Sequence, residues 1–137
     1  MEKNPAAPAR VTDSYVAPGQ HLLIDFWGAK HAQDIKAIEQ AMRAAAASCG
    51  ATVLDVMLHS FGEHSGVTGV AILAESHISI HTWPETDYMA LDVFVCGTCD
   101  AHKAADTLVK YFRPAKHDIT AHRRGMEPQQ QKAVQAC

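Results

Sequence analysis

Two short stretches of the sequence bring together side chains that could do chemistry. The first runs from Glu75 to Glu85 and reads Glu-Ser-His-Ile-Ser-Ile-His-Thr-Trp-Pro-Glu, and the second is Cys96-Gly97-Thr98-Cys99. His77 and His81 are four residues apart, so on a strand they share a face and could bind a metal with the two cysteines. The cysteines could also form a redox pair. Both interpretations are weak, because a second matched cysteine pair is missing and no helix clearly begins between the cysteines.

Hydrophobic periodicity indicates the elements that position these stretches. Apolar residues recur at helical spacing from about Ala32 to Cys49, where Gly50 is suited to end a helix, and again from Ala101 to Phe112. Alternating or β-rich runs predict strands over 21–27, 51–61, 70–73, 77–82, 88–96 and 117–122, with 70–82 as two short strands or one bent strand. Two helices around a run of adjacent strands predict an α+β fold. We expect a two-layer α/β sandwich with a mostly antiparallel sheet and both helices on one face.

The alternation within the strands predicts which side chains share a face of the sheet. In 88–96, Met89, Leu91, Val93 and Val95 point one way, while Asp92 and Cys96 point the other way. Leu54, Val56 and Leu58 are expected on the helix-covered side of 51–61. The opposite face should gather His81, Asp92 and Cys96, and we look for the chemistry there.

Length and charge narrow the possible functions. The 137 residues fit one domain, expected over 19–125, with a flexible arm over 1–18 and a flexible tail over 126–137. The formal net charge is -3 and no basic stripe is present, so nucleic acid is not the expected partner. No apolar run has the length of a membrane span, and the first ten residues do not resemble a signal peptide. The expected location is the cytoplasm.

Several motifs resemble those of the short prokaryotic S-adenosylmethionine decarboxylase proenzymes. The matching segments begin at Gly19-Gln20-His21-Leu22, continue through Gly66–Val70, Glu75–Glu85 and Asp92–Gly97, and end at Arg124-Gly125-Met126. The resemblance covers roughly residues 19 to 128 in order. The eleven residues from Glu75 to Glu85 are its most specific part.

The resemblance implies self-cleavage that produces a covalent cofactor. Ser76 Oγ would attack the carbonyl carbon of Glu75, and elimination would split the chain between these residues and leave a pyruvoyl group at position 76. His81 would help to remove the Cα proton of residue 76, and Thr68 would support the cleavage intermediate. The pyruvoyl group then forms a Schiff base with the substrate, as pyridoxal cofactors do. Cys96 would protonate the product. No metal is implied.

The resemblance also implies a substrate and an assembly. Phe61 would stack on adenine and Glu85 would bind the ribose hydroxyls, although Phe61 and Trp83 could instead be core aromatics. The product would be the aminopropyl donor for spermidine synthesis, and the expected assembly is a homodimer of cleaved αβ protomers, packed sheet to sheet.

Two departures from the family pattern leave alternatives open. Thr68 stands where the family usually has serine, which raises the alternative of an unprocessed regulatory relative. The link Gly62-Glu63-His64-Ser65 replaces a proline-containing one. Its Glu63 could pair with a basic substrate, so a pyruvoyl-dependent arginine or ornithine decarboxylase is the second alternative.

Overall fold

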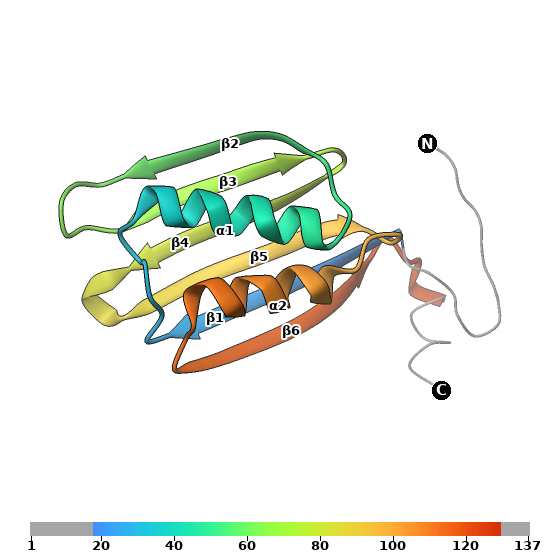
Figure 1. Cartoon of the computed structure of the whole chain (residues 1–137). Coiled ribbons are helices and arrows are strands. Elements are labelled where there is room, and N and C mark those ends of the chain that lie inside the picture. The colour runs from blue at the N-terminus through green and yellow to red at the C-terminus, as the bar shows by residue number, and fades with distance from the viewer. Residues whose placement is uncertain (1–17, 130–137) are drawn as a thin grey trace.

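The computed structural model describes residues 18–129, which form one six-stranded sheet with two helices on one side (Figure 1). The chain order is β1 (Gly19–Trp27), α1 (Ile35–Ser48), β2 (Val53–Ser60), β3 (Val67–Leu73), β4 (Ser76–Trp83), the 3-10 turn η1 (Pro84–Thr86), β5 (Tyr88–Cys96), α2 (Ala101–Phe112) and β6 (Lys116–Arg124). The spatial order is β2-β3-β4-β5-β1-β6, and every neighbouring pair is antiparallel. The predicted two-layer α+β sandwich is confirmed.

Local sequence signals explain where the helices begin and end. Asp34 caps α1 because its Oδ1 accepts a hydrogen bond from the amide of Ala37 at 3.1 Å, so the helix begins at Ile35 and not at Ala32. Gly50 has a φ of 85°, and the amides of Gly50 and Ala51 donate to carbonyl groups in the last turn. The glycine therefore ends α1, as predicted.

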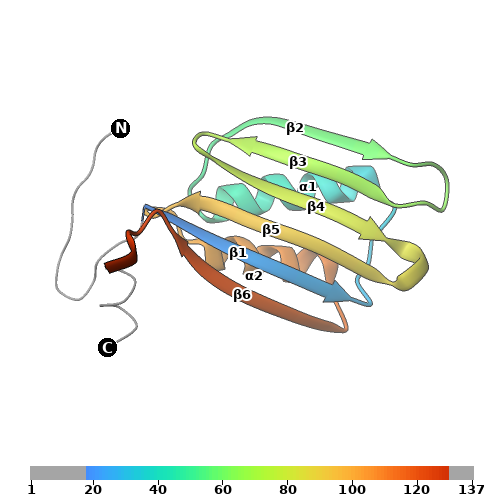
Figure 2. The same ribbon diagram turned by 180° about the vertical axis from the view of Figure 1, so that it is seen from behind.

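The core lies between the helices and one face of the sheet. It contains Met89, Leu91, Val93 and Val95, together with the fully buried rings of Phe26 and Phe112. The alternation predicted for 88–96 is thus confirmed. The opposite face, here called the open face, has no helix over it in the described part of the chain (Figure 2).

The prediction that Leu54 lies on the helix-covered side of the sheet was wrong. Leu54 is 65% exposed, because the pairing of β2 with β3 shifts register between Val53 and Asp55. Such a bulge adds one residue to a strand and turns the side chains before it to the other face. Val56 and Leu58, which follow the bulge, do pack against the core.

The segment 67–83 forms two separate strands joined by a tight hairpin. Leu73 pairs with Ser76, so that Ala74 and Glu75 alone connect β3 to β4. The expected arm and tail lie mostly in residues 1–17 and 130–137, outside the described residues. Met126, at the start of the expected tail, is buried at 6% exposure. Within residues 18–129, no helix is long and apolar enough to cross a membrane.

Candidate active site

Ser76 occupies the first position of β4, directly after the hairpin. Its Oγ is buried and is the one such side-chain oxygen or nitrogen in the described chain that has no hydrogen-bond partner. Leaving a buried hydroxyl unpaired costs about 1–3 kcal/mol, so the unpaired group requires an explanation. Alternation assigns this side chain to the helix-covered face, together with Ile78 and Ile80.

Glu75, just before Ser76, has an unusual backbone conformation. Its φ is 66°, in the left-handed region that residues with a Cβ rarely adopt. This conformation costs on the order of 1–2 kcal/mol. The peptide bond between Glu75 and Ser76 therefore joins a strained residue to one with an unpaired hydroxyl.

Cys96 ends β5 on the open face, at the same end of the sheet as Ser76. His77 pairs with Phe94, so that Ser76 and Cys96 both lie beyond this pair. The Cys96 Sγ lies 3.1 Å from Thr98 Oγ1 and 3.6 Å from Cys99 Sγ. Burial raises the pKa of the Cys96 thiol, but hydrogen bonds from Thr98 and Cys99 outweigh it and leave the pKa below its ordinary value. Ser76 and Cys96 thus lie at the same end of the sheet, but their side chains are assigned to opposite faces. We call these two residues together the Ser76 half-site.

His81 and Thr68 meet on the open face near the other end of β4. They are paired across β4 and β3, and Thr68 Oγ1 lies 3.1 Å from His81 Nδ1. The two residues predicted to support processing are thus within hydrogen-bond distance of each other, and their role in processing stays a prediction. We call Thr68 and His81 the His81 half-site.

Aromatic rings and carboxylates border the His81 half-site. Trp83 lies 6.0 Å from His81 and stacks on Tyr88 at 5.4 Å, while 41% of Trp83 remains exposed. Phe61 is 63% exposed beside His59, whose strand position faces Thr68. These two rings are available to a ligand and are not part of the core.

The two candidate carboxylates differ in surroundings. Glu85 lies in η1, directly after the strand that carries His81 and Trp83. The side chain of Glu63 is 90% exposed in the link between β2 and β3, and its carboxylate lies 3.9 Å from His64 Nε2. Both carboxylates are exposed, and both are near the His81 half-site in the chain, because Glu85 follows His81 by four residues and Glu63 precedes Thr68 by five.

The predicted catalytic residues thus fall into two groups that a single chain does not bring together. Ser76 and His81 are five residues apart on β4. At about 3.3 Å per residue this is roughly 16 Å, more than a histidine side chain can bridge. Likewise, the four residues of the metal interpretation are divided, because His77 contacts Asp92 while His81 contacts Thr68.

A third cluster, formed by His21, His77 and Asp92 on the open face of β1, β4 and β5, was not predicted from the sequence. The Asp92 carboxylate accepts hydrogen bonds from His21 Nε2 at 2.5 Å and His77 Nε2 at 3.0 Å, and its other oxygen accepts one from the hydroxyl of Ser79. The even spacing of His77 and Ser79 was visible in the sequence. The neighbour relation of β1 and β5 was not, so His21 could not be connected to the others.

Comparison with known proteins identifies the family. The family model described as S-adenosylmethionine decarboxylase matches residues 20–125. The chain belongs to the S-adenosylmethionine decarboxylase family. An S-adenosylmethionine decarboxylase proenzyme of Methanococcus aeolicus is 46% identical over 110 residues, which cover 78% of this chain and 93% of the relative. One of Thermomicrobium roseum is 41% identical over 109 residues, covering 79% and 94%.

A solved structure supports the same assignment. The crystal structure of the adenosylmethionine decarboxylase from Aquifex aeolicus superimposes with a TM-score of 0.72 at 32% identity, covering 82% of this chain and 95% of that one. Within this S-adenosylmethionine decarboxylase fold, Thr68 keeps a hydroxyl in contact with His81 despite the departure from the usual serine.

Proposed function

We propose that the chain is a proenzyme that cuts itself between Glu75 and Ser76 and then decarboxylates S-adenosylmethionine. The observation that carries this proposal is the unpaired, buried hydroxyl of Ser76 beside the strained Glu75. A hydroxyl without a partner is free to attack the preceding carbonyl carbon, and breaking the peptide bond releases the strain at Glu75. The product would be the aminopropyl donor for spermidine synthesis.

The residues around position 76 fit a pyruvoyl group derived from Ser76. Elimination would leave Oγ of Ser76 on the new carboxylate of Glu75, and loss of ammonia would turn the Cα of residue 76 into the ketone carbon, so the hydroxyl that is unpaired before the cut is removed from residue 76. When formed, the group supplies a carbonyl that accepts the substrate amine and takes up the electrons left by carbon dioxide. The cut also separates residue 76 from Glu75, so residue 76 can turn toward the open face that carries Cys96.

Cys96 would hold the proton that the product needs. The Thr98 hydroxyl and the Cys99 thiol can stabilise the sulfur of Cys96 after its proton has left, because both lie within hydrogen-bond distance. The lowered pKa of the Cys96 thiol brings proton release nearer to neutral pH. Cys96 must stay a thiol to give its proton while a second thiol lies 3.6 Å away, so the proposed location is the cytoplasm, where thiols are kept reduced.

The wide separation of the two half-sites supports a homodimer of cleaved αβ protomers. If two open faces pack on each other about a two-fold axis that lies between them and runs across the strands, the Ser76 half-site of one protomer lies over the His81 half-site of its partner. The open face also exposes large apolar side chains, with Leu23 at 46%, Met57 at 60% and Ile72 at 41%, as a surface that packs on a partner does. His81 would then serve Ser76 in trans.

The intact mass of the denatured protein tests the cleavage. Two fragments divided between Glu75 and Ser76, the second lighter by one ammonia than its serine form, would support the proposal. A single chain that persists after long incubation would contradict it and would favour the unprocessed regulatory relative. The contact of Thr68 with His81 leads us to expect cleavage.

Co-expression of two inactive variants tests the shared site. Ser76→Ala chains lack the nucleophile, and His81→Ala chains lack the histidine. In a mixed dimer, one site combines Ser76 with the His81 of the partner, so about half of the His81→Ala chains should be cut if equal amounts pair at random. His81→Ala chains expressed alone should remain uncut. The shared site is wrong if His81→Ala chains stay uncut in the mixture, and the role of His81 is wrong if these chains are cut when expressed alone.

Substrate choice can be tested directly after cleavage. Exposed Trp83 and Phe61, with Glu85 two residues after Trp83 in the chain, suit an adenine ring and ribose hydroxyls. Release of carbon dioxide should be much faster from S-adenosylmethionine than from arginine or ornithine. Glu85→Gln should raise KM for S-adenosylmethionine, whereas the same change at Glu63 should not. The reverse result would favour a basic amino acid as substrate.

A further inference from the structure

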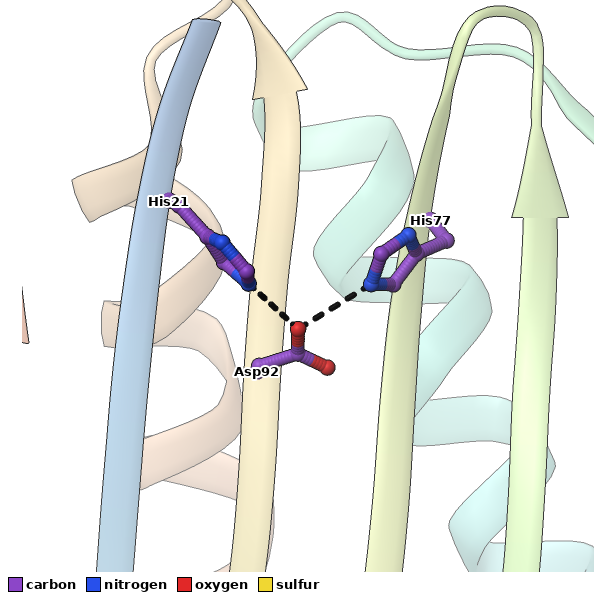
Figure 3. Close-up of side chains that lie close together, drawn as sticks. All are labelled: His21, His77 and Asp92. Carbon is purple, nitrogen blue, oxygen red and sulfur yellow. Dashed lines mark hydrogen bonds and ion pairs between the residues drawn. The ribbon is translucent and has the colours of Figure 1, made fainter. Parts of the chain in front are cut away.

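The cluster of His21, His77 and Asp92 joins three neighbouring strands on the open face, toward the end of the sheet at which β1 and β4 begin (Figure 3). Asp92 lies on β5, with His21 on β1 to one side and His77 on β4 to the other. The Asp92 and His21 side chains are each 17% exposed and that of His77 is 37% exposed. The cluster is therefore largely shielded from water even in the single chain.

The positions of the protons in this cluster follow from Arg124. Its Nη1 lies 2.9 Å from His21 Nδ1, and a guanidinium can only donate hydrogen bonds. His21 Nδ1 must accept, so the proton of the neutral ring is on Nε2 and is donated to Asp92. A metal at His21 Nε2 would require this proton to move to Nδ1, against Arg124. The cluster is thus built as a hydrogen-bond network and not as a metal site.

Asp92 is the acceptor on which the network depends. Burial raises the pKa of its carboxyl, but hydrogen bonds from Ser79, His21 and His77 outweigh burial and lower the pKa below its ordinary range. Asp92 is therefore ionised at neutral pH. A hydrogen bond to an ionised group is about twice as strong as one between neutral groups, so His77 is held firmly.

We propose that His77 and Asp92 are positioning residues that hold the new chain end in place after self-cleavage. The inference rests on the proposed function. Before the cut, Ala74 and Glu75 connect β4 to β3. After the cut, residue 76 begins a chain, and chain ends fray unless they are anchored. His77 is the first residue behind this end, and the nitrogen of His77 is bonded to the carbonyl carbon of residue 76.

The surroundings of the His77 ring support a role as the fixed point about which residue 76 turns. Besides its bond to Asp92, the ring packs edge-on against Phe94 at 5.8 Å and against His21 at 6.0 Å. These contacts come from β5 and β1, which the cut does not touch. The orientation of residue 76 relative to Cys96, also on β5, therefore follows from the orientation of His77.

The test compares Asp92→Asn and His77→Leu with the unaltered protein, all as full chains. Hydrogen exchange of the amides of residues 77–80 is measured in the cleaved form and in an uncut Ser76→Ala background. We expect both variants to be cut. In the cleaved form, their amides at 77–80 should exchange at least tenfold faster than those of the unaltered protein, and in the uncut background they should exchange at the same rate. Both variants should lose at least tenfold in kcat, with KM changed less than twofold. His77→Gln, which keeps a donor, should recover part of kcat, and Asp106→Asn on the exposed side of α2 should behave as the unaltered protein.

The outcomes separate this inference from the proposed function. An unaltered chain that is never cut would refute both. If the unaltered chain is cut and active, equal exchange and equal kcat in Asp92→Asn would refute the positioning role alone. A variant that is folded but uncut would also refute it, because the network would then act before cleavage. A general loss of structure would appear as faster exchange in the uncut background as well, and it would overturn the inference.

Discussion

Thr82 lies between His81 and Trp83, and its replacement by valine should weaken the fold and displace the His81 half-site. Thr82 is 5% exposed. Its Oγ1 accepts a hydrogen bond from the amide of Val67 at 2.8 Å and donates one to the carbonyl oxygen of Ala32 at 2.6 Å. One hydroxyl thus ties β4 to the beginning of β3 and to the loop before α1.

The structure gives the size of the effect. Valine has nearly the same shape as threonine, so Thr82→Val creates no cavity but leaves the Val67 amide and the Ala32 carbonyl without this partner. Each unpaired buried group costs about 1–3 kcal/mol, and partial relaxation brings the expected loss to about 2–4 kcal/mol in the free energy of unfolding. Thr82→Ser keeps the hydroxyl and should lose only about 1 kcal/mol or less, because a single methyl group is removed.

Urea denaturation followed by circular dichroism measures this difference. The Ser76→Ala background keeps the chain uncut, so that one polypeptide unfolds, and a fixed protein concentration removes the effect of association. A loss of less than 0.5 kcal/mol, about the size of an ordinary surface substitution, would refute the reasoning for Thr82→Val. It would mean that water or another group satisfies both backbone partners.

Three further predictions concern the thiol pair and a tyrosine on the open face. Cys99→Ala should raise the pKa of the Cys96 thiol, because a hydrogen-bond donor to the sulfur is removed. The pKa is measured from thiolate absorbance against pH, with Cys96→Ser as the reference that lacks this thiol. A titration curve unchanged by Cys99→Ala would contradict the prediction. A low-molecular-weight disulfide should oxidise Cys96 and Cys99 to a disulfide with loss of activity, reversed by dithiothreitol, and Cys99→Ala should not form this bond. The hydrogen bond from the Tyr88 hydroxyl to Asp25 Oδ1 at 2.5 Å raises the pKa of Tyr88 to about 12. The raised pKa of Tyr88 contributes to the free energy of unfolding below pH 10, and this contribution should be lost as the pH rises from 10 to 12. Asp25→Asn should lose less free energy of unfolding over the same range. Equal losses in the two proteins would contradict the role of the hydrogen bond.

Local patterns predicted most elements of the fold because they depend on neighbours in the chain. The strand Tyr88–Cys96 and the helix Ala101–Phe112 have the predicted bounds. Leu54 was misassigned because a bulge depends on how β2 pairs with β3, and no alternation within β2 reveals it.

For the candidate site as well, the sequence predicted the residues, and the strand pairing decided their contacts. The residue types at positions 66–70 and 75–85, with the resemblance that they carry, singled out Thr68, Ser76 and His81. The contact between Thr68 and His81 needed the pairing of β3 with β4. His21 was part of a matching segment, but its contact with the Asp92 carboxylate at 2.5 Å could not be predicted, because 71 residues separate the two in the chain.

The sequence by itself determined the family, the order of most elements, the faces of the strands and the candidate chemistry, because these follow from residue types at short spacing. Only the tertiary structure decided which strands are neighbours, and hence that the Asp92 carboxylate accepts hydrogen bonds from His21 and His77. It also decided that Ser76 and His81 lie too far apart on one straight strand to act together. The physical reason is that hydrogen-bonded strand pairing sets distances between residues that are remote in sequence, while the rise along a strand separates residues that are close in it.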